Sequence, residues 1–216
     1  MDRYIIQFPD IRLYKTSREV TDLTHATSIV KKMEEIAFAI RSSIYTYPRG
    51  FEMAAPQMGE FLRIIILQGD YHSDPESIET VPMINVNILQ ESEASYNWED
   101  CLSVKDMRGY VKRCKRIRVR YAALNGETIE EEFQGDMACD IQHGVDHLDG
   151  KLFFERDMKY LIPLSLYRSL KEKGIHVLNE HVKNNFHLFN SRQHCTQAEM
   201  TRYGLRHPRQ SLPIGR

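Results

Sequence analysis

The most informative part of the sequence is a single stretch, Ala138-Cys139-Asp140-Ile141-Gln142-His143-Gly144-Val145-Asp146-His147-Leu148. Its apolar residues Ile141, Val145 and Leu148 recur at spacings of four and three, which predicts a helix with one apolar stripe. His143 and His147 are four residues apart, about one helical turn, so their imidazoles lie on the same face. Two imidazoles placed in this way can bind one metal ion.

Acidic residues extend this polar face toward the start of the helix. Asp136 and Asp140 precede His143 on the same side. A helix face that carries so many ionisable groups is costly to bury unless it faces a metal or a wet cavity. The alternative is a solvated helix with two surface histidines, and the helix by itself does not distinguish between the two.

The stretch departs from the metalloprotease signature His-Glu-x-x-His at one position. Gly144 stands where the signature has its general base. A glycine in a helix interior costs about 1 kcal/mol relative to alanine, so helix stability does not explain its presence. The sequence therefore keeps two candidate metal ligands and lacks the proton-transferring residue beside them.

Composition is typical of an ordinary globular protein. The chain has 216 residues, of which 42% are hydrophobic and 27% charged, so a single domain with a proper core is expected. The net charge of −1 gives no reason to expect nucleic-acid binding, and no apolar run is long enough to predict a transmembrane helix. Scattered cysteines without a disulfide pattern predict a reducing compartment, either the cytoplasm or an organelle matrix, and the first residues do not resemble a targeting segment.

The remaining pattern predicts an α+β fold. A long amphipathic helix is expected over Thr21–Tyr45, capped by Thr21 or Asp22, and another over Leu161–Glu172. Short strands are expected at residues 62–67, 83–89, 116–121 and 128–133. Residues 47–59, rich in small residues and punctuated by Pro and Gly, are expected to form a loop, and residues 1–174 one domain with 175–216 as an extension or tail.

A catalytic metal needs a third protein ligand. Cys101, in the stretch Trp98–Val104, is the best candidate, and Cys139 is an alternative on the histidine helix. A buried cysteine is more often a small apolar side chain, so neither cysteine would be assigned on its own.

Three motifs in the chain resemble those of the peptide deformylases. Gly50 to Gln57 is similar to the family pattern Gly-x-Gly-Leu-Ala-Ala-Pro-Gln. Glu99 to Ser103 is similar to Glu-Gly-Cys-Leu-Ser, and Gln142 to Leu148 to Gln-His-Glu-x-Asp-His-Leu. Arg108 stands where the family has an arginine seven residues after the motif cysteine. The resemblance covers about residues 4–173 and implies short antiparallel strands around a central metal-binding helix.

The resemblance implies a role for each motif residue. Cys101, His143 and His147 would hold one divalent metal, Fe²⁺ or Zn²⁺, with an open position for the water that attacks the formyl carbon. Gln57 and the backbone N–H of Leu102 would donate hydrogen bonds to the developing oxyanion. Asp146 and Arg108 would hold the metal ligands in place without binding the metal themselves. The partner would be the N-terminus of a peptide or nascent chain. The residues expected to line the substrate site are Gly50, Phe51, Glu99, Asp136 and Asp140.

The departures from the family pattern bear on activity. Loss of the base at Gly144 removes a group that typically supplies a 10²–10⁴-fold rate gain, roughly 3–5 kcal/mol. Asp100 replaces a glycine beside Cys101, and Asp136 with Asp140 makes the expected methionine pocket acidic, so formyl-methionine is expected to be a poor substrate.

Glu52 replaces the second glycine of the first motif and is the candidate for a substitute base. The alternative is that Glu52 points into solvent and blocks the cleft. Three functions remain open from the sequence: a deformylase with weak or altered activity, a metal-binding homologue that only binds peptides or proteins, and a hydrolase of another N-acyl substrate.

Overall fold

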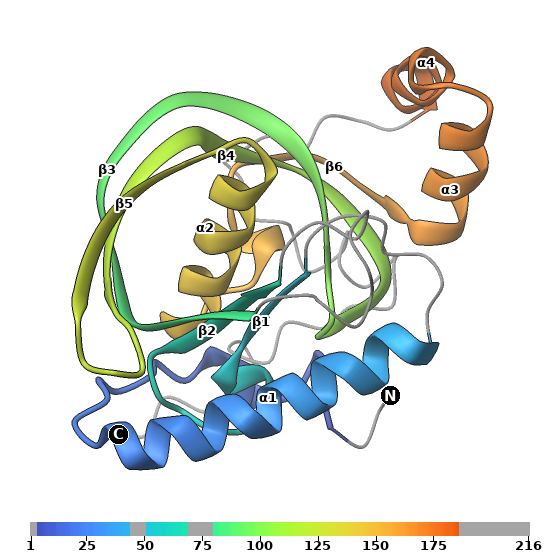
Figure 1. Cartoon of the computed structure of the whole chain (residues 1–216). Coiled ribbons are helices and arrows are strands. Elements are labelled where there is room, and N and C mark those ends of the chain that lie inside the picture. Colours follow the sequence, from blue (N-terminus) through green and yellow to red (C-terminus); the bar gives the residue numbers. More distant parts are fainter. Residues whose placement is uncertain (1–3, 44–50, 69–79, 186–216) are drawn as a thin grey trace, which may run out of the picture.

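The fold is an α+β arrangement in which a curved antiparallel sheet wraps around one central helix (Figure 1). The computed structural model describes residues 4–43, 51–68 and 80–185. Its strands and α-helices are, in chain order, α1 (Leu23–Ser43), β1 (Phe51–Ala54), β2 (Ile64–Gln68), β3 (Thr80–Cys101), β4 (Val104–Ala122), β5 (Thr128–Gln134), α2 (Asp136–Leu148), β6 (Met158–Pro163), α3 (Leu164–Glu172) and α4 (Ile175–Asn185). The sheet order is β1-β2-β3-β4-β5, and β6 pairs with residues 107–111 of β4, on the same edge of that strand as β5.

The strands β3 and β4 form one long hairpin that turns at Leu102 and Ser103. Only short parts of both strands were expected, because the sequence between residues 89 and 116 is polar and lacks the apolar alternation of a half-buried strand. Backbone pairing extends the hairpin to the Cys101–Val104 pair, and three register shifts interrupt the ladder. Such bulges bend a strand, and the hairpin curves around α2 in Figure 1.

Helix α2 is the buried centre of the structure. It begins directly after Gly135, whose φ of 67° favours glycine, and Ile141 and Leu148 are completely buried against the sheet. His143 is 8% and His147 1% exposed. The alternative of a solvated helix with surface histidines is therefore wrong.

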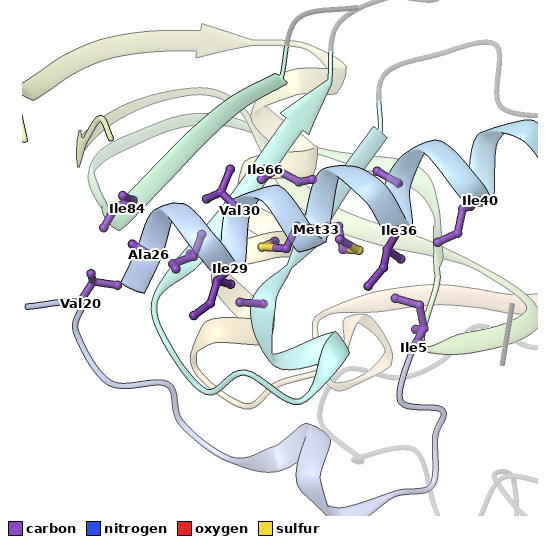
Figure 2. Close-up of a cluster of buried hydrophobic side chains, with 14 residues drawn as sticks. Ile5, Val20, Ala26, Ile29, Val30, Met33, Ile36, Ile40, Ile66 and Ile84 are labelled. Atoms are coloured by element: carbon purple, nitrogen blue, oxygen red, sulfur yellow. The ribbon is translucent and has the colours of Figure 1, made fainter. Parts of the chain in front are cut away.

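The long helix expected near the N-terminus is confirmed as α1. Asp22 caps it, because its Oδ1 accepts hydrogen bonds from the backbone N–H groups of Thr24 and His25 at 2.9 and 3.2 Å. Figure 2 shows its apolar stripe, including Met33 and Ile36, packed against β1 and β2. This packing covers the face of β1 and β2 opposite α2, so the two strands are held between two helices.

The first motif differs from the expected loop. Phe51–Ala54 forms β1, paired with β2 so that Glu52 lies opposite Leu67, and Ala55–Met58 then forms a short 3-10 helix. The backbone is regular here because Met53 is fully buried and fills the layer beneath α1. The motif is consequently held rigidly on a paired strand.

The C-terminal helix expected at Leu161 begins three residues later, at Leu164. Residues Met158–Pro163 pair with β4 instead, and Pro163 marks the change from strand to helix. Part of the expected extension forms α4, whose Leu178 and Val182 are buried in a cluster with α3. Residues 186–216 lie outside the described part of the chain, and within that part no helix is long and apolar enough to cross a membrane.

Candidate active site

Three potential metal ligands meet beside the centre of the sheet. Cys101 ends β3 at the tip of the long hairpin, whereas His143 and His147 lie one turn apart on α2. Cys101 Sγ is 3.2 Å from His147 Nε2, which is itself 3.2 Å from His143 Nε2. The ligand atoms of the three residues all lie within 4.8 Å of one another, and all three residues are buried.

The donor set fits a catalytic metal. One thiolate and two imidazoles suit Zn²⁺ or Fe²⁺, and three protein ligands leave a coordination position open. Glu99 Oε2 lies 3.0 Å from His143 Nδ1, so the Nε2 lone pair of that ring is presented toward Cys101 and His147. Cys139 is not part of the cluster: its Sγ instead accepts a hydrogen bond from Asn97 at 3.3 Å.

A buried ion network stands behind the ligands. Arg113, 3% exposed, donates to both oxygens of Glu99 at 2.6 and 2.9 Å and to Asp146 at 2.6 Å. Arg156 donates to Asp146 from the other side. This network connects His143 through Glu99 and Arg113 to Asp146, so the expected substrate residue Glu99 has both oxygens engaged within the protein.

Charges in this network displace several pKa values. Burial opposes ionisation of Glu99, but the charge and hydrogen bonds of Arg113 outweigh it and lower the Glu99 pKa to about 2. Burial likewise lowers the His143 pKa, but Cys101 and Glu99 raise it well above its usual range. The pKa of His147 is lowered by burial and by the charge on His143.

Gln57 is placed at the same cluster by the 3-10 helix after β1. Its Oε1 accepts the backbone N–H of Ala54 at 2.9 Å, which turns the Nε2 group toward Cys101 Sγ at 3.7 Å and Ser103 Oγ at 3.2 Å. Leu102 occupies the turn between Cys101 and Ser103. The structure thus brings Gln57, Leu102 and the three ligands into one site.

Glu52 lies against Gly144. A Cβ atom on Gly144 would stand 2.5 Å from Glu52 Oε1 and 2.9 Å from Ile65 Cγ2. Oε1 of Glu52 is inaccessible to solvent and has no hydrogen-bond partner among the described residues. Burial raises the pKa of Glu52 to about 8, although the charge of His143 opposes this rise. The carboxylate faces α2, so the alternative in which it points into solvent does not hold.

Asp136 and Asp140, the two acidic residues expected to line the substrate pocket, differ in burial. Asp140 is partly buried, and burial together with Glu99 and Asp136 raises its pKa to about 7. Asp136 is exposed at the start of α2 and lines a cavity of about 330 Å³. Polar residues dominate that cavity, whose lining includes Glu93, Asn97, Lys115 and Arg116.

The other expected site residues are placed as follows. Arg108 pairs with Asp100 at 3.3 Å, and its guanidinium lies over the Tyr167 ring at 4.2 Å from the centroid, so it supports the C-terminal helix α3. Phe51 begins β1, and Gly50 lies outside the described residues.

A model of the polypeptide deformylase family matches residues 3–160. This chain belongs to the polypeptide deformylase family. A peptide deformylase from Rhodopseudomonas palustris is 34% identical over 181 residues, which cover 80% of this chain and 97% of that protein. One from Dictyoglomus thermophilum is 37% identical over 135 residues, which cover 62% of this chain and 84% of the relative.

Solved deformylase structures share the fold. The Met-Ala-Ser-bound class I type b peptide deformylase from Acinetobacter baumannii superposes with a TM-score of 0.58 at 31% identity, over 70% of this chain and 96% of that one. A probable peptide deformylase from Synechococcus phage S-SSM7 gives a TM-score of 0.60 at 30% identity, over 70% and 97% of the two chains. The expected deformylase-like α+β fold is thereby confirmed.

Two arginines that support the site in this deformylase family member, Arg113 and Arg156, were not predicted from the sequence. Arg113 is one of many basic residues in the alternating strand β4, and Arg156 follows α2 without a motif of its own. The only available signal was that buried carboxylates at Glu99 and Asp146 require cationic partners, which does not say which arginines provide them.

We expect this deformylase family member to bind close to one equivalent of divalent metal per chain, because Gly144 replaces a residue that is not a ligand and leaves the three donors in place. Elemental analysis of protein purified without chelator is the measurement, with His143→Ala as the variant that loses metal. A folded wild type that stays metal-free after anaerobic incubation with Fe²⁺ or Zn²⁺ would contradict this expectation.

Proposed function

We propose that this chain is a metal-dependent peptide deformylase, which hydrolyses the N-formyl group of a peptide or nascent protein to formate and a free amine. The observation that carries the proposal is the cluster of Cys101, His143 and His147 with the Gln57 amide turned toward it. These residues come from three separate motifs, with both histidines on α2, and they converge on one buried point.

Each residue around the cluster has a defined task in this proposal. A divalent metal, Fe²⁺ or Zn²⁺, supplies Lewis-acid chemistry by acidifying water and polarising the formyl carbonyl. Gln57 donates from Nε2 to the oxygen that becomes negative, and the backbone N–H of Leu102 is the second donor. Ser103 helps to orient Gln57, since its Oγ lies 3.2 Å from the same Nε2.

Glu99 positions a ligand in this proposal and does not contact substrate. Its hydrogen bond to Nδ1 fixes the orientation of the His143 ring, and the Arg113–Asp146 pair in turn fixes Glu99. Carboxylate–histidine contacts of this kind hold the ring orientation and raise ligand basicity.

A second candidate is a metal-binding homologue that captures N-terminal peptides without hydrolysing them. Gly144 favours it, because the helix offers no base after the first histidine. Formate release by metal-loaded protein, measured on a panel of N-formyl peptides, separates the two candidates. Turnover that disappears in Gln57→Leu supports the hydrolase, whereas saturable peptide binding without formate supports the binding protein.

The substrate preference is expected to favour a basic first residue. Asp140 places a partly buried carboxylate on the face of α2 that also carries His143, so a formyl-lysyl peptide should have a higher kcat/KM than a formyl-methionyl peptide. Asp140→Leu should shift the ratio of the two values toward methionine by roughly 10-fold or more. Asp149→Asn, at the C-terminal end of the helix where the side chain pairs with Arg63, is the control that should leave the ratio unchanged. Equal kcat/KM values for the two peptides with wild-type protein would contradict the prediction that Asp140 favours a basic first residue.

A further inference from the structure

Glu52 and the missing side chain of residue 144 compete for the same space. A Cβ atom at position 144 would lie 2.5 Å from Glu52 Oε1 and 3.1 Å from its Cδ. Non-bonded carbon–oxygen pairs do not approach this closely without displacement. A side chain at position 144 would therefore force the Glu52 carboxylate out of its present place, and it would also press on Ile65 Cγ2 at 2.9 Å.

Helix stability gives no other reason for the glycine. Gly144 lies in the interior of α2 with an ordinary helical backbone. Alanine has the highest helix propensity of all residues and would be favoured over glycine at such a position. What the glycine does provide is room for the Glu52 carboxylate beside the residue that follows the first metal ligand, His143.

We propose that Glu52 is the general base of this deformylase, supplied from β1 in place of a glutamate on α2. The inference rests on the proposed function, and it deepens it by naming the group that moves the proton. The two substitutions are reciprocal: glycine replaces the glutamate of the family pattern on α2, and a glutamate replaces the glycine of the pattern on β1. The carboxylate is then supplied to the site by β1.

The fold holds Glu52 firmly in this position. Its strand pairs with β2 at Leu67, and the next two residues, Met53 and Ala54, are fully buried. Ala54 also donates its backbone N–H to Gln57, so the strand that carries the base is tied directly to the oxyanion donor. Main-chain pairing therefore fixes both groups relative to α2.

The Glu52 carboxylate also has a hydrogen-bond acceptor without a protein donor in the described part of the chain, as expected of a base that acts on water. Its Oε1 is buried without a hydrogen-bond partner among the described residues, which is costly for a carboxylate. A water at the metal ligands would provide the missing donor, and a base must lie within hydrogen-bond reach of the proton it takes. A purely structural glutamate would be expected to have a protein partner instead.

The proton transfers balance with Glu52 as the only shuttle. Glu52 takes a proton from the attacking water, whose oxygen forms a bond to the formyl carbon. The bond from that carbon to the amide nitrogen then breaks, the electron pair remains on nitrogen, and Glu52 returns the proton to it. The products are formic acid, which ionises, and the free amine, and the carboxylate is regenerated.

The first test is Glu52→Gln, which keeps the shape of the side chain and removes its basicity. We expect kcat for formate release to fall by about 10²–10⁴-fold while metal content and KM change little. Glu60→Gln, the same substitution at an exposed residue of the following turn, should behave like wild type. An active wild type whose Glu52→Gln variant keeps kcat within about threefold would overturn the proposal.

The second test is the reciprocal exchange itself. In Gly144→Glu the new side chain should collide with Glu52, and Glu52→Gly should lack the base. Both single variants should therefore be nearly inactive. Glu52→Gly with Gly144→Glu should regain at least roughly 10-fold over either single variant. Glu52→Gly with Gly144→Ala is the matched control, because it fills the site without a carboxylate and should stay inactive. Equal activity of the two double variants would overturn the proposal.

The third test needs no catalysis and uses metal-free protein. Gly144→Ala improves helix propensity but collides with Glu52, so its effect on the melting temperature should depend on residue 52. The change in melting temperature should be more favourable in the Glu52→Gly background than in wild type by about 3 °C or more. Identical changes would show that the two side chains do not share this space and would overturn the proposal.

Failure of the proposed function looks different from failure of this inference. A metal-loaded wild type that releases no formate from any peptide contradicts the function itself. A wild type that releases formate at a rate independent of Glu52 contradicts only the assignment of the base.

Discussion

Replacing Cys101 with alanine is expected to abolish metal binding and to lower formate release by at least roughly 10³-fold, since the metal supplies several kcal/mol of transition-state stabilisation. Two imidazoles alone leave the site without its thiolate, and Gln57 loses the sulfur atom against which its amide rests. Elemental analysis and formate release on the same preparation are the measurements. Cys114→Ala is the matched control, because Cys114 is partly exposed on the neighbouring strand and belongs to no metal cluster among the described residues.

Thermal unfolding separates this loss from misfolding. Cys101 is a small, buried side chain, so its truncation in metal-free protein should change the melting temperature by only a few degrees. A Cys101→Ala variant that still binds a full equivalent of metal, with its circular dichroism unchanged, would show that another residue completes the ligand set.

Replacing Arg113 with methionine is expected to have the largest effect on stability. The guanidinium connects two buried carboxylates, Glu99 and Asp146. Its removal leaves Glu99 without an arginine partner among the described residues and leaves Asp146 paired with Arg156 alone. Breaking a buried ion pair in this way costs about 3–5 kcal/mol, which corresponds to a fall of roughly 10 °C in the melting temperature. Arg118→Met is the control on the same strand, because Arg118 pairs with Glu130 at the surface, where such pairs are worth about 0–1 kcal/mol.

The pH dependence of this variant has a defined sign. The pKa of Glu99 is lowered to about 2 in the folded protein, so the ion pair stabilises the fold above the ordinary carboxyl pKa near 4.5 and this contribution is lost as pH falls toward 2. The difference in free energy of unfolding between wild type and Arg113→Met should therefore shrink across this range. A difference that stays constant from pH 6 to pH 2.5 would show that the destabilisation comes from lost packing.

Local periodicity predicted the helices of the core well. The apolar stripe of α1 and the spacing of the histidines on α2 are visible in the sequence because each lies within a few helical turns. The length of the β3–β4 hairpin could not be predicted in the same way. Its outer half, from Gln90 to Tyr96, is held by pairing with β4, a partner that sequence patterns do not identify.

The metal ligands and Gln57 could be proposed because they lie in ordered motifs. The charges behind them could not, since Glu99 and Arg113 are on different strands and meet only through the hairpin register. The sequence likewise presented Glu52 and Gly144 as two separate departures from the family pattern. Only their contact in space makes them one feature.

That contact constrains how such a chain can arise by descent. From a relative with glutamate after the first histidine, a single change at the Glu52 position would crowd two acidic side chains into one space, and a single change at the Gly144 position would leave none. With Glu52 as the proposed base, both intermediates would lose activity, so the two substitutions would have to arise together or while selection on activity is relaxed. Lineages should accordingly carry one arrangement or the other as a fixed pair, which makes the two positions covary although 91 residues of chain lie between them.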